Sequence, residues 1–230
     1  MIALKFLGRG AVGLFSGFAW PVPSADAPGP WVEVDGPLVT GSNGVHGCRL
    51  DDATGWMDDQ LWLVELDGEL REGPDTIVAR RGRLLRRLEA WDEPAAREFA
   101  EACLRRTQYR LGLAGDELGD VQAAALEAAD AASGQARDAL HYLADAIELA
   151  AGGRPDRYAA QPGTDPPTPG ALAANLGFVC AHAAGHLAAG PSAEDDAYAA
   201  GFSAERRHQL EWLTERLELE RVLAPAPVTA

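Results

Sequence analysis

The sequence predicts an α+β protein, in which a small β-rich or α+β module at the N-terminus is followed by an alanine-rich bundle of four or five helices. Five of the six tryptophans lie before residue 92, in a region also rich in Gly, Pro and Val: Trp20, Trp31, Trp56, Trp62 and Trp91. The rest of the chain is rich in alanine, and its apolar residues recur at helical spacing. This change in composition places a boundary near Asp92. We therefore expect residues 1–92 to form the tryptophan-rich module, residues 93–223 the helical bundle and residues 224–230 a disordered tail.

Strand patterns define the first module. A strand-like run covers residues 2–7, and apolar residues alternate with polar ones, at the two-residue period of a half-buried strand, in residues 31–34, 61–66 and 76–79. Turns are predicted at Asp67-Gly68 and at Glu72-Gly73-Pro74, because these residue types favour reversal of the chain. A short helix is expected within residues 51–59.

Capping residues mark the helices of the second module. Three helices are expected to begin at polar caps, with proline following the first two: Asp92 before Pro94, Thr168 before Pro169, and Ser203. Two more helices are expected over about residues 120–132 and 135–150, and Gly152-Gly153 ends the second of them. The Pro- and Gly-rich run 154–169 predicts a loop.

Charge and cysteine content limit the classes of function. The chain has 35 acidic and 20 basic residues, a net charge of −15, which argues against a nucleic-acid partner and favours a basic one. Lys5 is its only lysine, a usage typical of a GC-rich bacterial genome. The three cysteines are far apart, so neither a disulfide framework nor a four-thiolate zinc site is expected, and a reducing cytoplasm is the predicted location. No signal peptide and no membrane span are predicted, because Gly8-Arg9-Gly10 interrupts the N-terminal apolar run and no stretch of about 18 apolar residues follows.

The segment Gly8-Arg9-Gly10-Ala11-Val12-Gly13 matches the dinucleotide-binding pattern by letter and follows a strand-like run. That pattern also needs a helix directly behind the glycines. Here Gly17 and four prolines within residues 21–30 prevent such a helix. We therefore expect a loop or tight turn, with no dinucleotide cofactor.

His46 and Cys48 form a His-x-Cys pair, which a strand would place on one face. The pair could be half of a metal site, or a thiol activated by a neighbouring imidazole. Nothing in the sequence identifies the partners that either site would need, and cysteine is common in cores. A structural role is the alternative prediction.

A basic cluster lies at residues 80–87, with Arg80, Arg81, Arg83, Arg86 and Arg87. A strand would divide these side chains between two faces. We expect them to pair with the chain's own surplus of carboxylates, and an acidic ligand or partner is the alternative.

The segment Cys180-Ala-His182-Ala-Ala-Gly-His186 is the sharpest candidate site. On a helix, His182 and His186 fall in one stripe with Asn175, beside an apolar face, and two histidines at i and i+4 can bind one zinc ion. Ala183 stands where zinc proteases carry the glutamate that acts as general base. Gly185 and the surrounding alanines indicate close packing of another backbone. The alternatives are a metal site at His182 and His186 or a hydrogen-bonded helix interface.

An acidic stripe on the preceding helix offers a possible complement to this pair: Asp138, His141, Asp145 and Glu148. The helical wheel places the stripe almost opposite the apolar face of its own helix. We expect it to face solvent and not to complete a metal site.

Two resemblances add to this interpretation. The N-terminal pattern resembles a group of bacterial proteins of unknown activity, through Lys5-Phe6-Leu7, Gly17-Phe18-x-Trp20-Pro21, Gly44-Val45-His46-x-Cys48-Arg49 and Leu61-Trp62-x-Val64-Glu65-Leu66-Asp67-Gly68. The C-terminal part resembles immunity proteins of bacterial toxin systems, through Ala181-His182-x-x-x-His186 and the later Tyr198-Ala199-Ala200. The second resemblance implies binding to a protein partner.

The sequence thus favours a cytoplasmic, non-enzymatic interaction protein, immunity-like, whose acidic surface meets a protein partner and which needs no cofactor. The alternative is an enzyme with a site at the junction of the two modules, built from His46, Cys48, His182 and His186 and dependent on a divalent metal such as zinc. A purely structural module is the third hypothesis.

Overall fold

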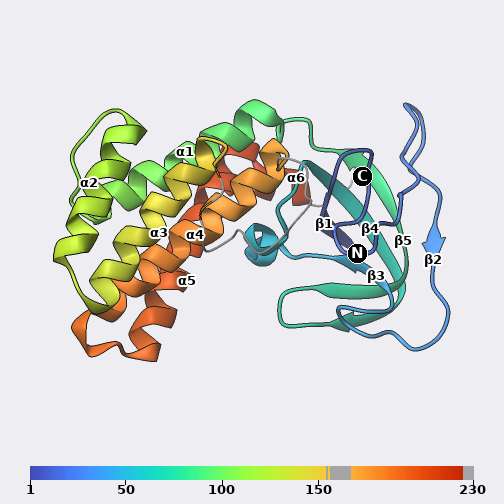
Figure 1. Cartoon of the computed structure of the whole chain (residues 1–230). Coiled ribbons are helices and arrows are strands. Elements are labelled where there is room, and N and C mark those ends of the chain that lie inside the picture. The colour runs from blue at the N-terminus through green and yellow to red at the C-terminus, as the bar shows by residue number, and fades with distance from the viewer. Residues whose placement is uncertain (154, 156–166, 225–230) are drawn as a thin grey trace. The chain divides into compact units, whose positions relative to one another are not determined.

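The computed structural model describes residues 1–153, 155 and 167–224, and it confirms the predicted α+β fold (Figure 1). The chain divides into two compact units. Among the described residues, the first unit contains Met1–Glu93 and the segment 212–224, and the second contains those of Pro94–Glu211. The predicted tail lies outside the described residues except for Ala224, and so does most of the predicted loop at 154–169.

An antiparallel sheet of five strands forms the first unit. Its order is β1 (Ile2–Leu7), β4 (Gln60–Glu72), β5 (Ile77–Arg87) and β2 (Val32–Glu33), while β3 (Val45–Gly47) pairs with β5 beyond this path. Each predicted strand is present. The turn predicted at Glu72-Gly73-Pro74 joins β4 to β5, and Gly73 donates its N–H to the Thr76 carbonyl at 2.7 Å.

The turn predicted at Asp67-Gly68 is wrong, because β4 continues through it to Glu72. The register of β4 on β5 shifts between Asp67 and Leu70, and Gly68 has a φ of 80°. Glycine reaches this left-handed conformation without steric cost, so the strand bulges here and does not reverse.

The remaining parts of the first unit follow the sequence patterns. The helix predicted within residues 51–59 is the 3-10 helix η1 (Leu50–Trp56). The glycine-rich segment after β1 is a tight turn, as predicted, in which Gly10 and Ala11 have φ values of 72° and 57°. The core of this unit is apolar and aromatic, and its fully buried members include Leu7, Val64, Leu66, Ile77 and Leu84.

Five long helices follow, α1 (Glu93–Arg110), α2 (Leu118–Ala131), α3 (Gly134–Ala150), α4 (Pro169–Ala189) and α5 (Asp195–Leu217), and then the short α6 (Leu219–Leu223). In Figure 1, α2, α3 and α4 lie side by side as successive layers of one bundle. Thr168 is the N-cap of α4 as predicted: its hydroxyl accepts the Ala171 N–H at 3.4 Å, and Pro169 occupies the first turn.

The start of α5 corrects a prediction. Ser203 lies inside α5 and does not cap it, because the helix begins at Asp195. The alanine-rich residues 197–200 favour helix, and Asp195 and Asp196 place negative charge on the first turn, where it stabilises the exposed N–H groups.

The division between the units also differs from the prediction. The boundary expected near Asp92 lies next to the division after Glu93, but a second division falls inside α5, before Trp212. The sequence predicts one bundle over residues 93–223 because the apolar helical pattern continues through this point. A continuous helix carries no compositional mark where its packing partners change.

Helix α4 is the one described helix that is long and apolar enough to cross a membrane, with a mean hydropathy of 1.3 in its most apolar window. Half of that window is buried inside the protein. A core helix of a globular bundle has the same composition, so this finding is weak support for a span, and the predicted absence of a membrane partner stays a prediction.

Small residues bring α4 and α5 together. A Cβ placed on Gly201 of α5 would lie 2.4 Å from Ala188 Cβ and 2.7 Å from the Ala184 carbonyl oxygen, and one on Gly185 would lie 2.8 Å from the Tyr198 ring. Gln209 of α5 also donates to the Gly177 carbonyl of α4 at 2.8 Å. The close backbone approach predicted at Gly185 is therefore confirmed.

Candidate functional site

A cavity of about 440 Å³ lies in the first unit. Its walls come from β1, β2, β3, the loop after β1 and the segment before β3, and they include Lys5, His46 and Cys48. Aromatic rings form much of the remainder: Phe6, Phe15, Phe18, Trp20 and Trp56. A concave, largely apolar site with a few polar groups, of this volume, suits a small organic molecule.

Lys5 is the basic side chain of this cavity. Its Nζ donates to the His46 carbonyl oxygen at 2.6 Å and lies 4.6 Å from the centroid of the Trp20 ring. Within the described residues, Lys5 forms no ion pair with a carboxylate. Burial, the largest effect, lowers the pKa of Lys5 to about 8, and Cys48 opposes this shift.

His46 is held by two backbone contacts. Its Nδ1 lies 2.9 Å from the Gly44 carbonyl oxygen, and its Nε2 accepts the Gly41 N–H at 3.0 Å. These partners assign the proton to Nδ1 of a neutral ring, and burial, the largest effect, lowers the pKa of His46. Both nitrogens are therefore engaged in shaping the segment before β3, which leaves neither available as a general base.

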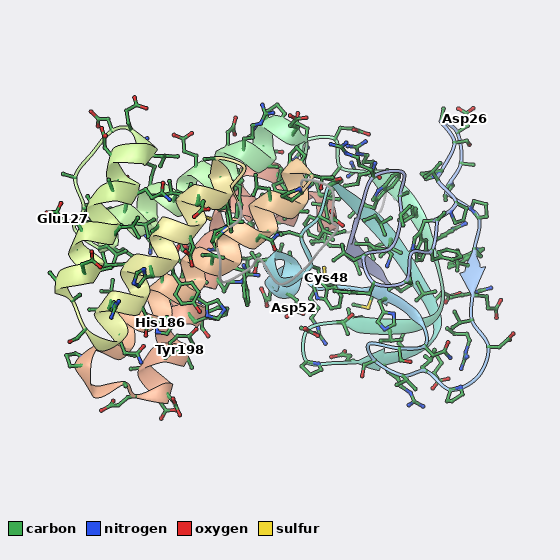
Figure 2. The ribbon with its side chains drawn as sticks, viewed as in Figure 1. Asp26, Cys48, Asp52, Glu127, His186 and Tyr198 are labelled. Atoms are coloured by element: carbon green, nitrogen blue, oxygen red, sulfur yellow. The ribbon has the colours of Figure 1, made fainter. Side chains whose placement is uncertain are left out.

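Cys48 lines the same cavity, but it is almost completely buried. Its backbone N–H and C=O pair with Leu4 of β1. Burial raises the pKa of the thiol to about 12, and the negative charge of Asp52, which Figure 2 shows beside it, adds to this increase. The thiol is therefore protonated near neutral pH, and the geometry does not support a thiolate activated by His46.

Two of the aromatic residues that line the cavity are also exposed to solvent. Phe15 is 83% exposed and touches Trp56 edge to face, with 6.0 Å between ring centroids. Phe18 is also exposed and contacts Trp20 in the same way at 5.7 Å. Large apolar side chains that remain in water beside a cavity favour binding of an apolar ligand, because binding removes their surface from water.

The sequence indicated His46 and Cys48 but missed Lys5. One signal was available: Lys5 is the only lysine of the chain, in a strand of apolar residues. The sequence alone does not show that Lys5 lies near His46 and Cys48. Strand pairing brings them together, because Leu4 of β1 pairs with Cys48 and β3 pairs with β5.

The arginine cluster behaves as predicted. It lies on β5, and four of its members pair with carboxylates of the same unit: Arg80 with Glu69, Arg81 with Asp67, Arg83 with Glu65 and Arg87 with Glu89. The guanidinium groups of Arg81 and Arg83 also lie over the ring of Trp31, at 4.7 and 4.5 Å from its centroid. Internal contacts thus account for four of the five arginines.

His182 and His186 lie on one side of α4, as predicted, and both rings stack on Tyr142 of α3, with centroids 5.3 and 5.1 Å away. His182 Nδ1 is hydrogen-bonded to the Tyr198 hydroxyl, and His186 Nδ1 to the Gln135 side chain. Figure 2 shows His186 and Tyr198 next to each other. Burial and the neighbouring His186 lower the pKa of His182. This arrangement is the hydrogen-bonded helix interface that we considered as the alternative.

Within the described residues, no group of three or more His, Cys, Asp or Glu side chains is placed to hold a metal ion. The zinc hypothesis for His182 and His186 therefore stays a prediction. Among the described residues, no third His, Cys, Asp or Glu is placed to complete such a site. Members of the acidic stripe are half-buried, including Asp138 and Asp145, so the stripe faces solvent less than we expected.

The structure places His46 and Cys48 in the first unit and His182 and His186 in the second. A shared site at a junction of the modules stays a prediction. No family model, curated protein or solved structure matches this chain.

Proposed function

We propose that the first unit binds a small, largely apolar organic molecule, whose polar end meets the Lys5 amine in the cavity. The observation that carries this proposal is an amine without a carboxylate partner, within the described residues, set among aromatic walls in a cavity of about 440 Å³. An ammonium group desolvated in this way is costly unless a ligand supplies a matching group.

Cavity volume and exposed rings support the same function. Both exposed rings that line the cavity, Phe15 and Phe18, would lose contact with water when an apolar ligand binds. The backbone contacts of His46 hold part of the wall in a fixed shape, which reduces the entropy lost on binding.

The interaction-protein hypothesis, including its resemblance to immunity proteins and a basic protein partner, stays a prediction. It rests on net charge, a general property of the surface, and on the resemblance of the C-terminal helices to immunity proteins, whereas the cavity is a specific arrangement of named groups. We therefore place ligand binding first and leave the cytoplasmic location as predicted.

We expect the protein to bind both the anionic dye anilinonaphthalene sulfonate and its neutral relative N-phenylnaphthylamine near pH 6.5. Lys5→Met should weaken binding of the anionic dye by about 10-fold or more, because a charge-assisted contact is lost, and should change binding of the neutral dye by less than about twofold. Fluorescence titration measures both affinities. Affinity for the anionic dye should also fall as the pH passes about 8, where Lys5 loses its charge.

Arg71→Met is the matched control, since it removes one positive charge from an exposed position of β4. It should leave both dye affinities within about twofold of the unchanged protein. Equal losses in the two variants, or no binding of either dye, would contradict the proposed function.

A further inference from the structure

We infer that Lys5 captures an aldehyde or ketone group of the ligand as an imine. This inference rests on the proposed function, since it uses the same cavity, and it adds the chemical class of the ligand. A carbonyl compound with an apolar body is the molecule that fits a reactive amine among aromatic walls.

The position of Lys5 suits a nucleophilic amine. Lys5 is only partly buried and lines the cavity, so a ligand in the cavity lies beside its side chain. The hydrogen bond to the His46 carbonyl fixes one N–H and leaves the nitrogen lone pair free when the amine is neutral. Because no carboxylate pairs with Lys5 in the described residues, no salt bridge holds the amine in its charged form.

Deprotonation of this amine is easier than for an ordinary lysine. Burial lowers the pKa of Lys5 to about 8, compared with roughly 10.4 for a solvated lysine. Near pH 7.5, the neutral fraction of Lys5 is therefore on the order of 100-fold larger. Desolvated lysines in apolar pockets form Schiff bases for this reason.

The reaction is balanced without a redox partner. Neutral Nζ attacks the carbonyl carbon, so a C–N bond forms while the C=O electron pair moves to oxygen, which takes up a proton. Nζ gives one of its two protons to solvent as the carbinolamine forms. The carbinolamine then loses its oxygen as water, and the second Nζ proton leaves with that water. The products are a C=N bond and one water molecule, and the apolar walls slow the reverse hydrolysis by limiting access of water.

The other titratable groups along the cavity do not compete. The Cys48 thiol stays protonated near neutral pH, which disfavours thiol addition to the carbonyl. His46 is neutral and engaged at both nitrogens, and Glu33 of β2 is exposed. The pH dependence of capture should therefore follow Lys5.

An internal competition tests this inference in the full chain. Arg71→Lys adds one exposed lysine, and Lys5 is the only other lysine present. We expect 2-naphthaldehyde with cyanoborohydride near pH 7.5 to label Lys5 at least about 10-fold more than the lysine introduced at position 71. The reduced adduct is located and quantified by peptide mass spectrometry, and fragment ions separate it from labelling of the Met1 α-amine.

Two controls define the outcome. Formaldehyde lacks an apolar body, so its preference for Lys5 should be several-fold smaller than that of 2-naphthaldehyde, and Lys5→Arg in the same background should abolish the major adduct. Labelling of Lys5 should increase with pH to a midpoint near 8, whereas labelling at position 71 should continue to increase toward about 10. Equal labelling of the two lysines would overturn the imine. Binding of the two dyes would still stand in that case, so a failure of this inference is distinguishable from a failure of the proposed function.

Discussion

Gly201→Ala is expected to lower the free energy of unfolding of the helical unit by about 3 kcal/mol. The added Cβ would lie 2.4 Å from Ala188 Cβ, 2.7 Å from the Ala184 carbonyl oxygen and 3.2 Å from Gly185 Cα. These obstacles are backbone or Cβ atoms, which no side-chain rotation can move, so the backbones of α4 and α5 must shift apart around Gly201. The higher helix propensity of alanine, about 1 kcal/mol, offsets only part of this cost.

Gly119→Ala is the matched control for this substitution. Gly119 lies in α2, and an added Cβ would meet no atom within 4 Å. This variant should gain about 0.5–1 kcal/mol, because alanine loses less backbone entropy than glycine on folding.

Urea unfolding followed by circular dichroism at 222 nm measures both variants, and tryptophan fluorescence reports mainly on the first unit, because five of the six tryptophans lie in residues 1–93. If both variants changed the unfolding free energy in the same direction, close packing would not be the reason for glycine at position 201.

Capping residues predict the start of a helix correctly when one or two residues decide where the helix begins. Thr168 and Pro169 mark the start of α4 because a cap and a proline act within one turn. Ser203 is also a capping residue type, but the prediction that it begins a helix is wrong. The alanines before it already lie in α5, and the two aspartates in the first turn stabilise the N-terminus of that helix. A serine within a sequence of high helix propensity does not interrupt the helix, so it does not mark a helix start.

The candidate site could be predicted only in part. His46 and Cys48 were visible as a pair, because strand alternation is a local property. Their actual roles depend on pairings between distant segments: Leu4 with Cys48, and the Lys5 amine with the His46 carbonyl. The His182 and His186 stripe was predicted correctly on its helix, whereas its partners Tyr142 and Tyr198 come from other helices whose packing the sequence does not specify.

Glu205→Ala is expected to cost the helical unit about 3 kcal/mol of unfolding free energy. Glu205 is completely buried on α5, and its Oε2 accepts hydrogen bonds from Arg106 and Arg110 of α1, at 3.0 Å each. Removing the carboxylate leaves two guanidinium groups facing each other and a small cavity. Both arginines remain partly exposed, so water compensates some of the loss, and the cost in unfolding free energy lies at the lower end of the range for broken buried pairs.

Glu205→Gln should cost about half as much. The amide oxygen can still accept from both arginines, but the bonds lose their charge, and the amide nitrogen takes the place of Oε1, which has no hydrogen-bond partner within the described residues. Glu101→Ala serves as the matched control, because Glu101 forms an exposed pair with Arg105 at 3.8 Å and its loss should change stability by no more than about 0.5 kcal/mol.

In urea unfolding followed at 222 nm, a double-mutant cycle of Arg106→Ala with Glu205→Ala should give a coupling of more than about 1 kcal/mol. A coupling near zero, or a Glu205→Ala cost no larger than that of Glu101→Ala, would show that the buried carboxylate does not join α1 to α5.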